Sequence, residues 1–490
     1  MTYEPTLQSV RQHEVPKWFQ DAKFGIFVHW GPFTIPAFAP IGRGTINEIL
    51  VKEGTASFFK NIPYSEWYLN SLRIPGSPVS QRHTETYGSD YSYFDFYPQF
   101  KEAAGAVHQR QWDPEIWADL FREARAGYVV LVTKHHEGFL MWPSQTPNYR
   151  WPGYQSERDI VGELTEAVKA RGMRMGVYYS SLLDWSLTDK PMTDPAGLVS
   201  EGGPIDEAYL RYQYSHWREL IDRYEPAILW NDIGFPPGAN LYELFAYFYN
   251  KVPDGAVNDR WTQLPRGLHR LIRTPVGRAL FNWATKRVIA NGTLGTLTPP
   301  HCDFLTAEFK AYPEIRQVKW ESCRGMANGF GYNRMEKDED YLKLPELIRL
   351  LVDIVSKNGN LLLNVGPMAD GTIPEVQVNL LKGLGAWLRE YGEAVYGTRP
   401  WRRAEGVTAQ GMEVRFTQKG DSLYAFILGR PGEKNVLIKD VPLAGNIRVY
   451  EVKSGTPLEF RQEGTDLVLS YPQGLLEESV QVVGIKTLSS

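Results

Sequence analysis

Cysteine is scarce in this chain, and long apolar runs are absent. Its 490 residues include 2 cysteines, Cys302 and Cys323, which excludes a disulfide-stabilised scaffold. No stretch approaches the roughly 18 uninterrupted apolar residues of a membrane-spanning helix, so no membrane partner is expected. The N-terminus has no basic segment followed by an apolar run, so no signal peptide is visible and we expect a cytoplasmic protein.

An excess of charge of one sign is also lacking. The chain carries 53 basic and 57 acidic side chains, a net charge of −4, which argues against a protein built mainly to bind nucleic acid. Apolar residues make up 43% and charged residues 22%, as in an ordinary soluble enzyme.

One segment, residues 262–302, contains no aspartate or glutamate at all. A basic helix that binds a membrane, nucleic acid or an acidic polymer is one interpretation. Because the whole chain is acidic, we favour an insertion that packs on the rest of the protein or forms a contact in a homo-oligomer. Its basic residues are Arg266, Arg270, Arg273, Arg278, Lys286 and Arg287.

Tryptophan and histidine are missing from the C-terminal part of the chain. All 15 tryptophans lie between Trp18 and Trp401, and all 9 histidines lie between His13 and His301. The uneven distribution indicates that the chemistry lies before Trp401. Tryptophan often stacks on the apolar faces of sugars, although a large core uses it as well.

Short apolar segments alternate with helical patterns over most of the chain, which is typical of a parallel sheet buried on both faces. No Gly-x-Gly-x-x-Gly follows the first strand, so a dinucleotide-binding sheet has little support. An α/β fold with a (β/α)8-like, TIM-type barrel suits the alternation better. The predicted strands span residues 23–30, 128–136, 174–181, 227–232, 256–260, 303–309 and 360–366, and the predicted helices 114–126, 160–171, 209–224, 241–249 and 344–355.

Beyond Trp401 the apolar period changes to two, with turn signals such as Lys419-Gly420-Asp421 between the segments. This pattern predicts a C-terminal antiparallel β-sandwich. We expect a catalytic barrel over residues 1–398 and the sandwich over residues 399–490. The predicted sandwich strands span residues 412–417, 422–428, 435–438, 447–450, 466–469 and 480–485.

The predicted barrel strands end in polar or aromatic residues, and such ends converge on the active site of a barrel. Asp232 closes an apolar strand, where a carboxylate can act as nucleophile or base; capping the next helix is the structural alternative. Glu308 ends another predicted strand, and two carboxylates among aromatic residues indicate glycoside hydrolysis. His135 and His136 suit either a binding pocket or hydrogen-bonded positions in the core. No further residues at metal-ligand spacing accompany them, so no metal is expected.

A set of motifs in order along the chain then resembles the α-L-fucosidases of glycoside hydrolase family 29. The resemblance covers roughly residues 16–402 and implies a retaining enzyme with a barrel and a C-terminal β-sandwich. The motifs are WFQDAKFGIFVHWG, EWY, YVVLVTKHHEGF, ILWNDIG, VNDRW, KWESCRG, FGYN, GNLLLNVGPMADGTIP and AVYGTRPW.

The resemblance also implies roles for single residues. Asp232 matches the nucleophile of the family. Glu308 is the best match for the general acid/base, with Ala307 where the family often has proline, and Glu66 is the alternative. The positions that match the family's sugar-binding residues are His29, Glu66, Trp67, His135, His136, Tyr178, Trp230 and Arg260. Phe27 and Phe330 are the expected apolar partners of the C5 methyl group of fucose.

The expected partner is therefore an α-L-fucosylated oligosaccharide or glycan, and no cofactor is implied. Two other functions stay open at this point. One is a hydrolase of the same fold that acts on another L-sugar or deoxy sugar. The other is an inactive carbohydrate-binding barrel, which is disfavoured because both carboxylates are present.

Overall fold

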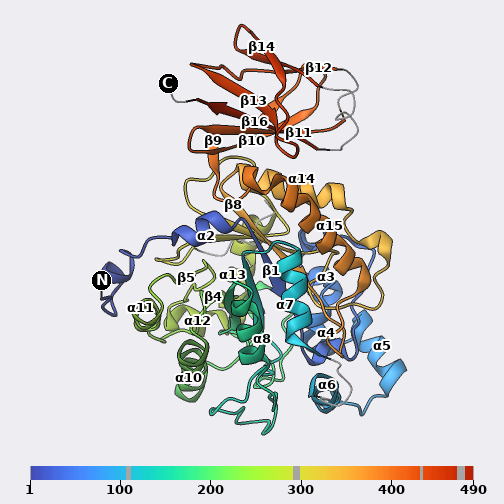
Figure 1. Ribbon diagram of the computed structural model, residues 1–490. Coiled ribbons are helices and arrows are strands. Elements are labelled where there is room, and N and C mark those ends of the chain that lie inside the picture. Colours follow the sequence, from blue (N-terminus) through green and yellow to red (C-terminus); the bar gives the residue numbers. More distant parts are fainter. Residues whose placement is uncertain (1, 106–111, 291–297, 431–433, 472–479, 489–490) are drawn as a thin grey trace.

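The computed structural model describes residues 2–105, 112–290, 298–430, 434–471 and 480–488. It shows a large α/β part and a smaller β-rich part stacked at one end of it (Figure 1). Part of the basic insertion, residues 291–297, lies outside the described residues. The same holds for residues 472–479 of the predicted sandwich.

The α/β part is built around a curled, parallel, eight-stranded sheet with the order β5-β4-β3-β2-β1-β8-β7-β6. Each strand of the central part is buried on both faces, which explains the near-continuous apolar runs of the sequence. The strands are β1 Phe24–Val28, β2 Tyr128–Lys134, β3 Arg174–Ser180, β4 Ile228–Asp232, β5 Ala256–Val257, β6 Leu305–Glu308, β7 Trp320–Gly325 and β8 Gly359–Val365.

Strands β5 and β6 are the two edges of this sheet, and the curl of the sheet brings the segment before β6 next to β5. No ladder joins β5 and β6 within the described part of the chain. Nevertheless, the Asp303 N–H donates to the Val257 carbonyl across 2.9 Å, which draws the start of β6 towards β5. The predicted TIM-type barrel is thus confirmed as a barrel-like sheet that is incompletely closed.

Helices cover the outside of the barrel and begin where local signals favour them. Asp206, for example, caps α10 by accepting from the Tyr209 N–H, and prolines occupy the first turn of α7 and α14. The helices that follow barrel strands or precede them include α7 Pro114–Glu123, α8 Ile160–Ala170, α10 Glu207–Tyr224, α11 Leu241–Lys251, α14 Leu344–Ser356 and α15 Glu375–Tyr391.

Further helices lie in the long connections. The connection between β1 and β2 holds α3 Ile46–Asn61, α4 Tyr68–Leu72, α5 Pro78–Tyr87 and α6 Phe96–Gly105, together with the 3-10 turn η2 Ser65–Trp67. The N-terminus forms α1 Leu7–Val10 and α2 Lys17–Ala22, and α9 Pro195–Ser200 follows β3. The sequence pattern predicted none of these, nor strand β7. Most of these elements are short, and the 16-residue α3 is interrupted by the non-helical Gly54, so their periodicity is weak.

The C-terminal part pairs two antiparallel sheets, with the orders β13-β16-β11-β10-β9 and β12-β15-β14. Its strands are β9 Arg399–Val407, β10 Glu413–Lys419, β11 Ser422–Leu428, β12 Asn435–Ile438, β13 Ile447–Glu451, β14 Glu459–Glu463, β15 Asp466–Ser470 and β16 Gln481–Thr487. The predicted β-sandwich is confirmed, with β9 and β14 as strands that the sequence pattern did not reveal. The division at residue 398 itself stays a prediction.

Strand β11 shows how the sandwich attaches to the barrel. Ala425 and Ile427 point into the sandwich core, whereas Tyr424 and Phe426 belong to the apolar cluster of the barrel part. The Phe426 ring lies 6.4 Å from that of Trp387 on α15. Alternate residues of one strand therefore contribute to both cores. Helices α14 and α15 lie directly beneath the sandwich (Figure 1).

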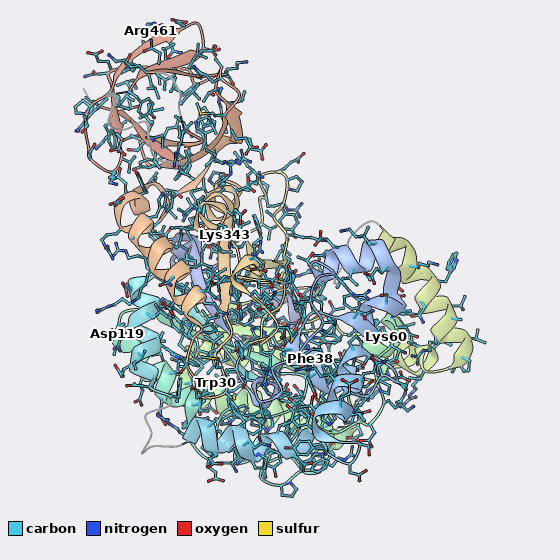
Figure 2. The ribbon with its side chains drawn as sticks, turned by 90° about the vertical axis from the view of Figure 1, so that its right-hand side faces the viewer. Trp30, Phe38, Lys60, Asp119, Lys343 and Arg461 are labelled. Atoms are coloured by element: carbon cyan, nitrogen blue, oxygen red, sulfur yellow. The ribbon has the colours of Figure 1, made fainter. Side chains whose placement is uncertain are left out.

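The basic insertion forms α12 Arg266–Ile272 and α13 Pro275–Ala290, and α13 packs on α9 and on α3. Figure 2 shows α13 beside α3 at the right of the molecule. Ion pairs support this attachment, because Arg278 lies 2.8 Å from Asp194 and 2.9 Å from Glu201. Arg266 lies 3.2 Å from Glu207. These contacts favour the interpretation of the segment as a packed insertion.

Candidate active site

Two carboxylates and one guanidinium meet at the carboxyl ends of three strands. Asp232 is the last residue of β4, Glu308 is the last residue of β6, and Arg260 follows the end of β5. Arg260 donates from Nη1 to Asp232 Oδ1 across 2.7 Å and from Nη2 to Glu308 Oε2 across 2.9 Å. One cation therefore joins both carboxylates that the sequence singled out.

The backbone turns sharply directly after each carboxylate. Ile233 and Phe309 have φ values of 53° and 51°, in the left-handed region that is a marked outlier for a β-branched residue such as isoleucine. The Ile233 N–H also donates to Asp232 Oδ1 across 2.9 Å. Asp232 therefore caps no helix here, and the turn ends the strand with its carboxylate facing the site.

The side chain of Arg260 is held in place by Thr306 and, through it, by Asp259. Its Nε donates to the Thr306 hydroxyl across 2.9 Å, and that hydroxyl donates to Asp259 across 2.7 Å. Its guanidinium carbon lies 4.8 Å from the centre of the Trp230 ring. Burial disfavours the charge of Arg260, but the carboxylates of Asp232 and Glu308 outweigh that effect and raise its pKa. The guanidinium is thus permanently charged and oriented to bond both carboxylates.

The second oxygen of Asp232 faces a tyrosine and a histidine. The Tyr178 hydroxyl donates to Asp232 Oδ2 across 2.9 Å, and His136 Nε2 lies 3.6 Å from the same oxygen. The hydroxyl of the neighbouring Tyr179 points to the other side of the strand and contacts His216 Nδ1 at 2.9 Å. Tyr178 is therefore the member of this pair that belongs to the site.

The three predicted histidines lie next to one another, with ring centres 5.7 Å apart for His29 and His135 and 4.0 Å apart for His135 and His136. His29 Nδ1 contacts Asn364 Oδ1 at 2.6 Å, and His136 Nδ1 contacts the Ser180 hydroxyl at 2.7 Å. Burial lowers the pKa of His135 to about 3 and that of His29 and His136 well below the ordinary value. The imidazoles are therefore neutral at physiological pH and act as hydrogen-bonding groups.

Glu66 lies in the 3-10 turn η2 and is 1% exposed. Its Oε2 accepts from the Gly331 N–H across 2.8 Å. A Cβ on residue 331 would lie 2.9 Å from that oxygen and 2.6 Å from the Phe33 ring, so only glycine permits this approach. Burial raises the pKa of Glu66 to about 7. Glu66 thus has a different environment from Glu308, whose side chain is 22% exposed and accepts from the Tyr64 hydroxyl across 2.8 Å.

Trp230 packs against Tyr178 and is held by a buried glutamate. Its Nε1 donates to Glu321 Oε1 across 3.0 Å, and the Tyr128 hydroxyl donates to the other oxygen of Glu321. Burial raises the pKa of this glutamate to about 7. The ring itself lies 5.4 Å from Tyr178, in a stacked arrangement, and 5.1 Å from Phe27.

The remaining predicted residues are aromatic and pack around the histidines. Trp67 lies 5.5 Å from His136 and 5.3 Å from Trp185, measured between ring centres. Phe330 stacks on His29 at 4.9 Å, and Phe27 lies 4.5 Å from the same imidazole. An apolar corner is thereby formed beside the polar groups.

The structure thus brings the predicted site residues together in one cluster at the carboxyl ends of the barrel strands, while their individual roles stay predictions. Sequence reasoning missed the residues that orient them, namely Tyr64, Asp259, Thr306, Ser180 and Glu321. Of these, Ser180 also follows apolar residues at a strand end, which is the signal that could have found it. Within the described part of the chain, no group of three His, Cys, Asp or Glu side chains is arranged to hold a metal. The same part contains no helix that is long and apolar enough to cross a membrane.

A sequence model of one enzyme family, described as alpha-L-fucosidase, matches residues 1–393. The chain belongs to the α-L-fucosidase family. It is accordingly a glycoside hydrolase, as the resemblance predicts. The tissue alpha-L-fucosidase of Bos taurus is 30% identical over 487 residues, which cover 96% of this chain and 87% of the bovine protein. The tissue alpha-L-fucosidase of Homo sapiens is 32% identical over 456 residues, which cover 90% of this chain and 81% of the human protein.

Solved fucosidase structures share the whole architecture. The Thermotoga maritima alpha-fucosidase in complex with a mechanism-based inhibitor is 40% identical, has a TM-score of 0.82, and matches 99% of this chain and 100% of its own. The same enzyme in complex with fucose is 39% identical, with a TM-score of 0.81 and coverages of 99% and 100%. The predicted combination of barrel and C-terminal β-sandwich is therefore that of fucosidases.

Proposed function

We propose that the chain is a retaining exo-α-L-fucosidase that acts by double displacement, with Asp232 as nucleophile and Glu308 as general acid/base. The observation that carries this proposal is the pair of ion pairs from Arg260, at 2.7 Å to Asp232 and 2.9 Å to Glu308. Retention requires the two carboxyl groups to lie about 5–5.5 Å apart, whereas inversion needs roughly 6.5–9.5 Å. A shared guanidinium keeps the carboxylates close together and favours the shorter separation.

In the first step, a carboxylate oxygen of Asp232 attacks the anomeric carbon and forms a β-linked fucosyl-enzyme. The glycosidic bond breaks, and Glu308 gives its proton to the leaving oxygen. In the second step, Glu308 removes a proton from water, whose oxygen attacks the anomeric carbon and releases Asp232. Two inversions return the α configuration to the liberated fucose.

The difference in exposure between the two glutamates supports Glu308 as the acid/base. The acid must reach the leaving group and then an incoming water, and the Glu308 side chain is 22% exposed. Glu66 is buried and accepts from the Gly331 backbone, which suits a fixed contact to the sugar. In this proposal Glu66 binds a hydroxyl of fucose and transfers no proton in either step.

The other groups suit the polar and apolar sides of fucose. The imidazoles of His29 and His136 each use Nδ1 for a protein contact, which leaves Nε2 for a sugar hydroxyl. The apolar corner of Phe27 and Phe330 suits the C5 methyl group. Rejection of L-galactose by this corner should be modest, because rejecting one added hydroxyl is worth about 10²-fold. The Thermotoga maritima enzyme, solved with fucose, supports the choice of sugar.

The substrate is tested by comparing aryl α-L-fucoside with aryl L-galactoside and aryl D-galactoside. We expect the highest kcat/KM for the fucoside and α-L-fucose as the first anomer seen by NMR. Preference for another sugar would favour a different hydrolase of this fold. No turnover of any of the three would favour a carbohydrate-binding barrel, and β-L-fucose as first product would contradict retention.

Azide rescue tests the roles of the carboxylates. In Asp232→Gly, azide should enter the place of the nucleophile and yield β-L-fucosyl azide. In Glu308→Ala, azide should replace the activated water and yield α-L-fucosyl azide. The matched control is Glu66→Ala, for which we expect no azide product. An α-azide from Glu66→Ala, with Glu308→Ala nearly active, would exchange the roles of the two glutamates.

A further inference from the structure

The two helices of the basic insertion expose a group of apolar side chains. Of the 13 large apolar side chains that are exposed in the described part of the chain, 5 fall within residues 268–283. They are between 39% and 70% exposed, and we call them the outer face: Leu268 and Leu271 of α12, and Val276, Leu280 and Trp283 of α13. Exposed apolar patches of this kind mark surfaces that contact another molecule.

Helix α13 turns its polar side towards the protein and its apolar side outwards. Val276, Leu280 and Trp283 follow one another at intervals of four and three residues, which places them on one face of the helix. Arg278 and Asn282 lie on the opposite face and contact the start of α9, at 2.8 Å and 2.9 Å. The polar contacts therefore fix the inner side of α13 and leave the outer face exposed.

The two helices form one unit. Residue 277, at the start of α13, is a glycine, and a Cβ there would lie 1.9 Å from the carbonyl oxygen of Leu271 in α12. Its N–H donates to the Thr274 hydroxyl across 3.1 Å. The ends of α12 and α13 thus approach closely, and α13 lies at the edge of the molecule (Figure 2).

The charged residues beside the outer face are basic. Arg270, Arg273 and Lys286 are exposed on the same part of the chain, and the insertion contains no aspartate or glutamate. The carboxylates of neighbouring segments pair with Arg266 and Arg278 instead. The outer face therefore combines exposed apolar groups with positive charge.

We propose that the outer face docks on a lipid surface that carries anionic headgroups. Its apolar side chains insert at the boundary between headgroups and acyl chains, while Arg270, Arg273 and Lys286 contact headgroup phosphates. The expectation that the chain has no membrane partner rested on the lack of a spanning segment. A helix that lies in the plane of the interface needs no such segment.

Charge favours a lipid surface over a second copy of the chain. A two-fold contact would place the outer face of one copy on that of the other. Arg270 and Arg273 of both copies would then come together without a carboxylate of the insertion between them, and like charges in a contact repel. Anionic headgroups supply the opposite charge, and the acyl chains accommodate the apolar side chains.

Sedimentation with sucrose-loaded vesicles tests the docking in the wild-type chain. We expect binding to phosphatidylcholine vesicles that contain phosphatidylglycerol, and binding at least about 10-fold weaker to pure phosphatidylcholine. Raising the salt from about 0.1 M to about 1 M should weaken binding, because the screening length falls from about 10 Å to about 3 Å. Equal binding to both kinds of vesicle, or binding to neither, would overturn the proposal. No sugar is present, so the outcome is independent of the proposed function.

Apolar variants test whether the outer face makes the contact. Leu280→Ser combined with Trp283→Ser should lower the partition coefficient into anionic vesicles about 10-fold or more. Ile116→Ser is the matched control, because Ile116 is 63% exposed on α7. Equal binding of the double variant and this control would contradict docking through the outer face. Thermal unfolding checks that each variant is folded, and the wild-type measurement decides if the double variant is not.

Charge variants test the contribution of the basic residues. Arg270→Glu combined with Arg273→Glu should also lower the partition coefficient about 10-fold or more. Arg122→Glu combined with Arg461→Glu changes the net charge by the same amount at two other exposed positions and should bind nearly as wild type. An equal loss in both pairs would mean that only net charge matters, and the proposal would be wrong.

Trp283 reports on the contact itself, since its side chain is 60% exposed. Brominated acyl chains should quench part of the tryptophan fluorescence of the bound wild-type chain. Trp283→Phe keeps an apolar ring, so it should bind as wild type but lose this quenching. Unchanged quenching would place a different surface in the membrane and refute the docking.

Light scattering distinguishes the lipid surface from a second copy. A molar mass of two chains that Leu280→Ser with Trp283→Ser reduces to one, without any binding of the wild type to vesicles, would identify the outer face as a contact between copies. That result would overturn the proposal.

Discussion

Arg260 donates from Nη1 to Oδ1 of Asp232 across 2.7 Å, in a site where each side chain is 11% exposed. The same guanidinium reaches Glu308 with its other terminal nitrogen. The positions of the nucleophile and of the acid/base in our proposal are therefore coupled through one side chain. Thr306 and Asp259 hold that side chain from the β5 and β6 side.

Arg260→Lys should lower kcat/KM for aryl α-L-fucoside by about 10²-fold or more. A single ammonium cannot replace two separate N–H donors, so one buried carboxylate loses its partner. Arg266→Lys is the matched control, since Arg266 is half exposed and pairs with Glu207 outside the site. A kcat/KM for Arg260→Lys equal to that of this control would show that the bridge is not needed for catalysis.

Substitutions of Glu66 should act mainly on binding. Glu66→Gln keeps an oxygen that can accept from the Gly331 N–H, and we expect KM to rise about 10-fold with little change in kcat. Glu66→Ala leaves that N–H without its partner and should raise KM further. Steady-state kinetics on the fucoside separates the two parameters. A large loss of kcat with unchanged KM would contradict a role in binding.

Glu321 should make the stability of the fold depend on pH. Burial raises its pKa from 4.5 to about 7, so between these values the folded chain holds a proton that the unfolded chain has lost. The free energy of unfolding therefore falls as pH rises through this window and levels off above it. Glu321→Gln abolishes this titration while retaining an amide that can bond Trp230 and Tyr128.

The stability of Glu321→Gln relative to wild type should accordingly rise between pH 4.5 and 7, by an amount on the order of 3 kcal/mol. Denaturation by urea at a series of pH values measures the difference. Other buried acids, such as Glu66 and Glu137, titrate in both proteins and cancel. A difference that stays constant over the whole range would refute the raised pKa of Glu321.

The acid limb of the pH–activity profile should not come from histidine. Burial lowers the pKa of His135 to about 3, so its imidazole stays neutral over the working range. His135→Gln should therefore lower kcat/KM by removing a hydrogen-bonding group but leave the midpoint of the acid limb unchanged. A shift of that midpoint in the variant would mean that His135 ionises during catalysis.

The sequence predicted which strand ends come together better than it predicted the details of the scaffold. Strand ends are recognisable because a buried apolar run stops at a polar residue, as at Asp232 and Glu308, and a barrel brings such ends together. Strand β7 escaped because Glu321 and Arg324 interrupt its apolar pattern. Their polar side chains have partners that only the folded structure reveals, such as Trp230 for Glu321.

Contacts between distant segments were equally hidden. The donation from Tyr64 to Glu308 joins residues 244 positions apart, and no local pattern marks it. The same holds for Gly331, whose N–H reaches Glu66 across 265 positions. Motif resemblance named the residues that we predict to face the sugar, whereas the residues that orient them depend on three-dimensional packing.

The most direct test of the proposed mechanism is to trap the intermediate. A 2-deoxy-2-fluoro-fucosyl fluoride slows both steps but supplies a good leaving group, so the first step outruns the second. Peptide mass spectrometry of the inactivated protein should find one fluorofucosyl group, on the carboxylate of Asp232. A label on Glu66 or Glu308, or inactivation without any added mass, would contradict the assignment of Asp232 as the nucleophile.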